Sequence, residues 1–225
     1  MVQESPHPVL ENKDSFVTRL NFFLPETSLS SVMNAYALAK LAHDSQKREG
    51  GERYFEHPRS VALIGIDECG IRDPDIISAL LLHDVFEDSE YFGSNSSNIP
   101  YSVKRQRAFY KISNVWNQRV AEMVLAVSKA PFDDIEVLTK KDKYDIYEHQ
   151  LENASPEALI VKMCDRLHNL RTLSFRSKSK QTEVVTETLN EYMPIFKGAH
   201  SAYPSETEYL IAAMNSAMQN LSDTL

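Results

Sequence analysis

Apolar residues recur along this chain at the three- and four-residue intervals of helices, and short polar segments separate the runs. From about residue 30 the segment SVMNAYALAKLAHDSQKR follows this period, and the paired glycines of EGGERYFEHP end it. Pro58 suits the first turn of a following helix, RSVALIGIDEC, which places His57 at its entry. Asp73-Pro74 opens another helix, which we expect to run through PDIISALLLHDVFED.

The second half of the chain continues the helical pattern. We predict a long helical stretch from Tyr101 to Lys129 with a break near Ser113, and an amphipathic segment over 138–151. Ser155 is a plausible N-cap before Pro156, which opens the helix EALIVKMCDRLHNLRTL. Two further segments, 182–196 and 206–221, complete an all-α chain, and GSNSSN (93–98) is a polar loop. We expect three parts: an N-terminal extension (1–27), a helical domain (28–200) and a C-terminal helix packed on it (201–225).

Size and charge limit the classes of function. The 225 residues, of which 42% are hydrophobic, are enough for one compact domain with a full core. The net charge of −8 argues against a general binder of nucleic acid or of anionic membranes, because both need a basic face. A small anionic substrate stays compatible, since a local cation can override the overall field.

The two cysteines, Cys69 and Cys164, are too few for a disulfide framework and fit a reducing cytoplasm. The N-terminal MVQESPHPVL has neither a basic nor an apolar region of a signal peptide. No apolar stretch reaches the roughly 20 residues that span a bilayer. We therefore expect a cytoplasmic protein with no membrane partner.

The segment ALLLHDVFEDSE places one histidine and several carboxylates directly after an aliphatic run. Charge at the end of a buried helix is costly unless a partner neutralises it. On a helix, His83 and Glu87 are four residues apart, as are Asp84 and Asp88, so each pair shares a face. A divalent cation would neutralise such a set, whereas a helix end with solvated acids is the simpler alternative.

A second apolar run also ends in polar residues. ALIVKMC (158–164) runs directly into Asp165, and His168 and Asn169 follow on the same side. Together with His57 at its helix entry, His83, Asp84 and Asp165 would make a four-ligand site between helices with room for water. Manganese, iron and zinc all suit a mixed set of imidazole and carboxylate ligands. A buried polar network without metal is the alternative.

The motifs, taken in order, resemble the hydrolase domain of the Rel/Spo family, which has the metal-dependent HD-domain fold and degrades the alarmones ppGpp and pppGpp. The matching segments cover most of residues 35–197: AHDSQKREGGERYFEHP (42–58), ALLLHDVFED (79–88), VAEMVLAVSK (120–129), ALIVKMCDRLHNLRTL (158–173) and ETLNEYMPIF (187–196). The resemblance implies an all-α HD-domain helical bundle and a stand-alone small alarmone hydrolase, with residues 28–200 as the hydrolase domain.

The resemblance also implies roles for individual residues. The ligands of one Mn²⁺ would be His57, His83, Asp84 and Asp165. Glu87 and Asp88 would be the catalytic acidic pair, and we leave open which of them is the base. The implied substrate contacts are Arg48, Tyr54, Lys129, Lys162, Asn169 and Tyr192, although the two lysines could equally be ordinary surface residues. In the implied reaction, metal-activated water attacks the phosphorus joined to the nucleotide's 3′ oxygen and releases pyrophosphate and GDP or GTP.

Two positions depart from the family's pattern: Glu49 stands where a basic residue is usual, and Arg53 where proline precedes Tyr54. Both lie in the loop expected to meet the base. Three functions therefore stay open: a (p)ppGpp 3′-pyrophosphohydrolase; an HD-domain hydrolase of ppApp, NADPH or a nucleoside monophosphate; and a non-catalytic protein that binds an alarmone or a toxin. The expected partner is a small nucleotide rather than a nucleic acid. The oligomeric state is not decided, and a homodimer stays open.

Overall fold

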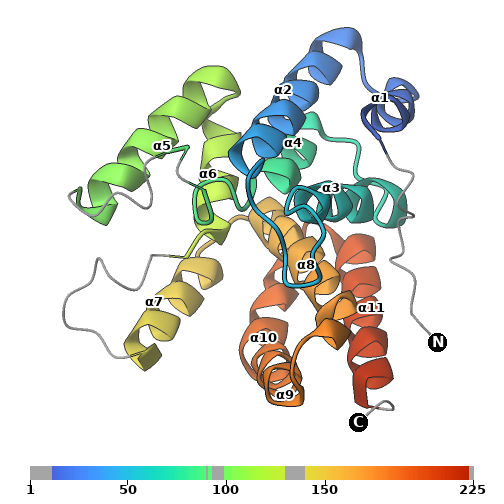
Figure 1. Ribbon diagram of the computed structural model, residues 1–225, viewed down its shortest axis with the longest axis vertical. Coiled ribbons are helices and arrows are strands. Elements are labelled where there is room, and N and C mark those ends of the chain that lie inside the picture. Colours follow the sequence, from blue (N-terminus) through green and yellow to red (C-terminus); the bar gives the residue numbers. More distant parts are fainter. Residues whose placement is uncertain (1–11, 90, 93–98, 130–139, 223–225) are drawn as a thin grey trace.

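A computed structural model describes residues 12–89, 91–92, 99–129 and 140–222 of the chain. These residues form helices joined by turns (Figure 1), and within them the only β-type pairing is an isolated bridge between Lys47 and Arg53. The α-helices are α1 Lys13–Asn21, α2 Glu26–Ala42, α3 Glu56–Leu63, α4 Pro74–Leu82, α5 Tyr101–Val115, α6 Gln118–Val127, α7 Lys140–Glu152, α8 Pro156–Arg171, α9 Lys178–Glu187, α10 Met193–Phe196 and α11 Pro204–Ser222. The predicted all-α fold is confirmed.

Helices α4 and α8 form the centre of the core. Helix α4 contacts α2, α3, α6 and α8, and α8 also contacts α11 (Figure 1). Residues 76–82 of α4 are all buried, as are most residues of α8 between Ala158 and Leu170. Burial of these aliphatic faces supplies most of the driving force for folding. This burial also places the polar residues that come after the aliphatic runs in the middle of the molecule.

The starts of α4 and α8 follow the predicted capping chemistry. Asp73 Oδ1 accepts a hydrogen bond from the Asp75 backbone N–H (2.9 Å), with Pro74 in the first turn. Ser155 Oγ likewise accepts from the Ala158 backbone N–H (3.2 Å), with Pro156 in the first turn. The prediction of Ser155 as an N-cap is confirmed.

The end of α4 differs from the prediction. The helix ends at Leu82, and residues 83–87 form turns rather than a further helical turn that reaches Asp88. The Val85 N–H bonds back to the Leu82 carbonyl (2.9 Å), an i→i+3 bond of the kind that tightens the last turn of a helix. The helical-face argument for His83 and Glu87 was therefore wrong. In this turn, neighbouring side chains can face different partners.

A short hairpin of residues 46–54 connects α2 to α3. The Arg48 N–H bonds to the Glu52 carbonyl (2.9 Å), and the Tyr54 N–H bonds to the Gln46 carbonyl (3.0 Å). Gly51 lies in the turn at φ 88°, a conformation that glycine adopts without a steric cost. The hairpin brings Arg48 and Glu49 beside α8 and η3 (Leu173–Phe175), where they bond to Asn169 and Arg176.

The remaining elements surround this core. Helix α1 lies within the range assigned to an N-terminal extension, and its Phe16 and Leu20 are fully buried, with the Phe16 ring 5.2 Å from that of Tyr36. Helix α5 ends at Val115, two residues after the break that we predicted near Ser113. The range 182–196 contains α9, a π-helical turn η4 (Thr188–Tyr192) and α10. The predicted loop 93–98 lies outside the described residues.

Candidate metal centre and active site

Three segments far apart in sequence bring potential metal ligands together. His57 comes from the first turn of α3, His83 follows the last residue of α4, and Asp165 lies on α8. All three are buried, and one ligand atom from each lies within 4.8 Å of the other two. Contacts of α3 and α4 with α8 hold these atoms in place.

Asp84 completes the group that the sequence predicted. Its Oδ2 lies 3.3 Å from His57 Nε2, and its Oδ1 lies 3.2 Å from His83 Nε2. The Oδ1 of Asp165 lies 3.2 Å from His57 Nε2 and 3.6 Å from His83 Nε2. Asp84 thus contacts both imidazoles of the group formed by His57, His83 and Asp165 and adds a second carboxylate beside it.

The hydrogen bonds around these ligands fit a cation among them. The Nδ1 of His83 lies 2.8 Å from the Leu80 carbonyl, which can only accept, so Nδ1 carries the proton. In the neutral ring, Nε2 then points a lone pair at the centre, where His57 Nε2 is only 3.2 Å away. Lone pairs and carboxylates repel one another unless a positive charge lies between them. A divalent ion that accepts nitrogen and oxygen ligands fits this donor set.

A metal ion would replace the proton that the carboxylates otherwise favour on His83 Nε2, so the pKa shifts reflect the same preference for positive charge at this point. Burial opposes the charge on His83, but the carboxylates of Asp84 and Asp165 raise its pKa well above the usual range. Burial likewise opposes the charge on Asp165, but the Lys162 ammonium, 2.9 Å from Oδ2, and the two imidazoles hold its pKa well below the usual range. The carboxylates are therefore ionised ligands, and the centre attracts positive charge.

A second layer of residues orients the ligands. His168 Nδ1 lies 2.8 Å from His57 Nδ1, and the Asn169 side-chain amide donates to Asp165 Oδ1 (2.6 Å). Arg48 in turn donates to Asn169 Oδ1 (2.8 Å). Such outer contacts fix the orientation and basicity of metal ligands. The sequence analysis placed His168 and Asn169 on the same side of the helix as Asp165, and both side chains contact ligands of the candidate centre.

The two residues of the acidic pair have different surroundings. Glu87 Oε2 accepts the backbone N–H of Lys129 (2.8 Å), and burial raises the pKa of Glu87 to about 7 against the opposing effect of the Lys162 ammonium. Asp88 Oδ2 accepts the hydroxyl of Tyr54 (2.5 Å), which also lies 3.0 Å from Asp84 Oδ2. Glu87 is therefore a group that can take up a proton near neutral pH.

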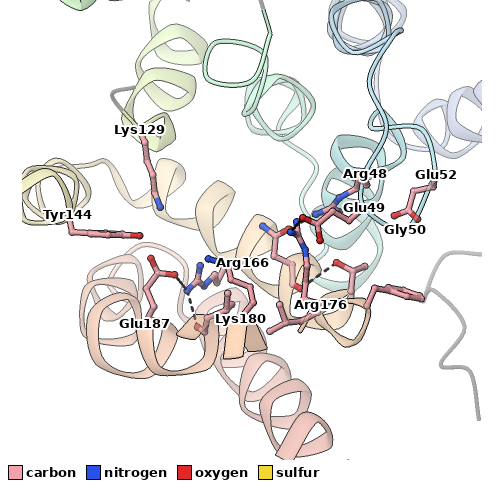
Figure 2. Close-up of a pocket in the computed structure, with 15 residues that line it drawn as sticks. Arg48, Glu49, Gly50, Glu52, Lys129, Tyr144, Arg166, Arg176, Lys180 and Glu187 are labelled. Carbon is pink, nitrogen blue, oxygen red and sulfur yellow. Dashed lines mark hydrogen bonds and ion pairs between the residues drawn. The ribbon is translucent and has the colours of Figure 1, made fainter. Parts of the chain in front are cut away.

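Beside this centre lies a cavity of about 240 Å³, shown in Figure 2. The 46–54 hairpin, α8, η3 and α9 form most of its wall, with Lys129 and Tyr144 on the opposite side. Five basic and three acidic side chains line it, so the local charge is opposite to that of the whole chain: Arg48, Lys129, Arg166, Arg176 and Lys180, with Glu49, Glu52 and Glu187. An anionic ligand suits such a cavity.

The predicted substrate contacts fall into two groups. Arg48, Lys129 and Asn169 line the cavity. The other three residues do not line it: Tyr54 bonds to Asp88, Lys162 bonds to Asp165, and Tyr192 is buried with its ring 4.3 Å from the Arg166 guanidinium. We had not predicted Arg166, Arg176 and Lys180 as lining residues, because single basic residues on helices carry no distinctive spacing.

Known proteins similar to this chain match the part of the sequence that carries these residues. A family model described as HD domain matches residues 35–199. A GTP pyrophosphokinase of Streptomyces antibioticus is 29% identical over 197 residues, which are 84% of this chain and 20% of that protein. The bifunctional (p)ppGpp synthase/hydrolase SpoT of Escherichia coli K12 is 30% identical over 176 residues, 77% of this chain and 22% of SpoT. The chain thus spans about a fifth of the length of these relatives.

A solved structure shares the fold. It is a metazoan ortholog of SpoT that hydrolyzes ppGpp and plays a role in starvation responses, and it aligns with a TM-score of 0.62 over 86% of this chain and 97% of that one. The sequence identity is 19%, so this likeness is one of fold. The resemblance that the motifs indicated is confirmed by these relatives. Within the described residues, no helix has both the length and the apolar character needed to cross a bilayer.

Proposed function

The chain belongs to the HD-domain family, and we propose that it is a metal-dependent 3′-pyrophosphohydrolase of ppGpp and pppGpp that releases pyrophosphate and GDP or GTP. The observation that carries this proposal is the convergence of His57, His83, Asp84 and Asp165 beside a basic cavity. Relatives named as (p)ppGpp hydrolases, and the ppGpp-hydrolysing metazoan ortholog of like fold, support the choice of substrate.

We propose Mn²⁺ as the ion, held by the two Nε2 atoms and by the carboxylates of Asp84 and Asp165. When bound, a divalent ion supplies the charge that lowers the pKa of water toward neutrality. Lys162 and Asn169 keep Asp165 ionised and oriented, as their bonds of 2.9 and 2.6 Å indicate. His168 orients the His57 ring through the 2.8 Å contact between their Nδ1 atoms.

Glu87 is the residue that we assign to proton removal from the attacking water. Its carboxylate is held by the Lys129 backbone, and its pKa near 7 suits a base that works at neutral pH. Asp88 is already occupied by the Tyr54 hydroxyl. We therefore assign Asp88 and Tyr54 to holding Asp84, since the same hydroxyl lies 3.0 Å from Asp84 Oδ2.

The basic cavity is the proposed site of the nucleotide. Its arginines and lysines offset the negative charge of two pyrophosphoryl groups, which an acidic chain would otherwise repel. Arg48 lies at the hairpin edge of the cavity, next to Asn169. This position supports a contact with the nucleoside end of the substrate.

Hydrolysis assays test the proposal directly. Wild-type protein with Mn²⁺ should convert ppGpp to GDP and pyrophosphate, as separated by anion-exchange chromatography. Asp84→Ala should lose both Mn²⁺ binding and turnover, because one of the four ligands is removed. Asp14→Ala, an exposed carboxylate on α1, is the matched control and should keep both.

One observation favours a second candidate substrate. Glu49, at the cavity edge, forms an ion pair with Arg176. This part of the wall therefore carries a carboxylate where a basic residue is usual in the resembled family. The same assay should therefore include ppApp, NADPH and dGMP. Product from one of these and none from ppGpp would make the protein an HD-domain hydrolase of another nucleotide. No product from any of them would favour the non-catalytic binder.

A further inference from the structure

Most of the cations that line the cavity already have protein partners. The arginines donate to oxygens of neighbouring side chains, and the exposed lysine of α9 does the same within its helix: Arg48 to Asn169, Arg166 to Glu187, Arg176 to Glu49 and Lys180 to Glu183. These four side chains shape the wall and balance its carboxylates. The charges of Arg166, Arg176 and Lys180 are partly neutralised before any substrate arrives, and Arg48 is bound to a neutral amide.

Lys129 has different surroundings. Its Nζ lies over three tyrosine rings, 5.5 Å from the centre of Tyr144, 5.0 Å from Tyr147 and 6.0 Å from Tyr192. Within the described part of the chain, no carboxylate forms an ion pair with it and no side-chain oxygen bonds to it. Ring faces attract an ammonium without accepting its protons in ordinary hydrogen bonds. The N–H groups of Lys129 are thus available to a ligand in the cavity.

The backbone of Lys129 places this ammonium next to the proposed base. Its N–H donates to Glu87 Oε2 (2.8 Å), while its side chain extends into the cavity in Figure 2. Tyr147 is itself held by a hydrogen bond from its hydroxyl to the Val127 carbonyl (2.7 Å), at the end of α6. Lys129 therefore holds the proposed base, Glu87, with its backbone and places a positively charged side chain in the cavity.

We propose that Lys129 is the general acid that protonates the departing 3′ oxygen of the nucleotide, an inference that rests on the proposed function. As the bond from water oxygen to phosphorus forms, the bond from phosphorus to the 3′ oxygen breaks and its electron pair stays on that oxygen. A proton moves from Nζ to the 3′ oxygen, which leaves as a hydroxyl. The neutral amine takes its proton back from solvent, and Glu87 receives the proton of the attacking water.

The chemistry of the leaving group calls for such an acid. A sugar alkoxide is a poor leaving group, and charge accumulates on it in the loose transition state of phosphoryl transfer. Burial lowers the pKa of Lys129, and the nearby Lys162 ammonium lowers it further, which makes Lys129 a stronger acid. The charged or titratable groups that face it are Glu87, Lys162, Glu187, Tyr144, Tyr147 and Tyr192.

The test compares two leaving groups in the Mn²⁺-loaded full chain. Lys129→Met and Lys129→Arg are assayed with ppGpp and with an analogue in which sulfur replaces the bridging 3′ oxygen. A thiolate leaves without a proton, so removal of a general acid should slow ppGpp by about 10²–10⁴-fold in kcat and the analogue by only a few-fold. Arginine keeps the charge but does not release a proton near neutral pH, so it should behave like methionine.

Lys111→Met is the matched control. Lys111 also lies over aromatic rings, 5.8 Å from Tyr91 and 5.7 Å from Phe92, but on α5 and not in the cavity. Its rates with both substrates should equal those of the wild type, and circular dichroism should show equal melting temperatures for all variants. An equal loss on both substrates, or retained kcat in Lys129→Arg, would overturn the role of Lys129 alone. A wild type that does not hydrolyse ppGpp would overturn the proposed function and this inference with it.

Discussion

Four polar side chains within six positions at the end of α4 reach three different surroundings. His83 and Asp84 face the metal centre, Glu87 bonds to the Lys129 backbone, and Asp88 bonds to Tyr54. The turn after Leu82 makes this possible, because a regular helix would have placed residues four apart on one face. Glu87 thereby has a partner of its own, while Asp84 and Asp88 share the Tyr54 hydroxyl.

The first prediction at this scale concerns the charge of Glu87. Its pKa, raised from 4.5 to about 7, means that the folded protein holds a proton there which the unfolded chain has already released. The contribution of this residue to stability is therefore present below pH 4.5 and is lost as the pH rises through about 7, by at most roughly 3 kcal/mol. Glu87→Gln should thus gain stability relative to wild type between pH 5 and pH 8, as measured by urea unfolding of the metal-free protein.

The same variant should bind Mn²⁺ normally and lose about 10²–10⁴-fold in kcat, since a base is removed and no ligand is. Glu122→Gln, an exposed carboxylate on α6, is the control and should show neither effect. Equal stability of Glu87→Gln and wild type at every pH would mean that the Glu87 carboxyl titrates as it does in water.

At the scale of elements, the hydrophobic pattern of the sequence predicted the helices that form by burying apolar side chains. Helices α4 and α8 were recognisable because each combines an aliphatic run with a cap and a proline in the first turn. His83, Asp84 and Asp165 could be named because polar groups directly follow such runs, and His57 because it stands at the entry of the next helix. The pairing of Arg176 with Glu49, 127 residues apart, had no local signal, since it depends on how the 46–54 hairpin meets η3. The end of α4 was also missed, because tertiary contacts of the turn outweigh helical propensity.

The hairpin leads to a prediction about substrate affinity. Glu49 places a carboxylate at the edge of the cavity and pairs with Arg176. Glu49→Gln should release Arg176 to an anionic nucleotide and lower KM for ppGpp several-fold, or roughly 0.5–1 kcal/mol, with kcat unchanged. The effect should shrink at high salt in steady-state assays, because the groups are solvent-exposed. A raised KM would show instead that Glu49 itself binds the substrate.

At the scale of the whole molecule, the metal centre joins distant parts of the chain. His57 on α3 and His83 and Asp84 after α4 come from the first third of the matched HD region, and Asp165 on α8 comes from its last third. An ion bound there would stabilise the native state, because the unfolded chain cannot assemble the four ligands. The acidic chain, with a net charge of −8, therefore has two neighbouring candidate sites, one proposed for a cation and one for a polyanion.

The most direct test of the central claim is anomalous diffraction at the manganese edge from crystals grown with Mn²⁺. We predict one strong peak within coordination distance of His57 Nε2, His83 Nε2 and the carboxylates of Asp84 and Asp165. The peak should disappear in crystals of Asp84→Ala. A peak elsewhere, or none among these four side chains in crystals of an active preparation, would contradict the account.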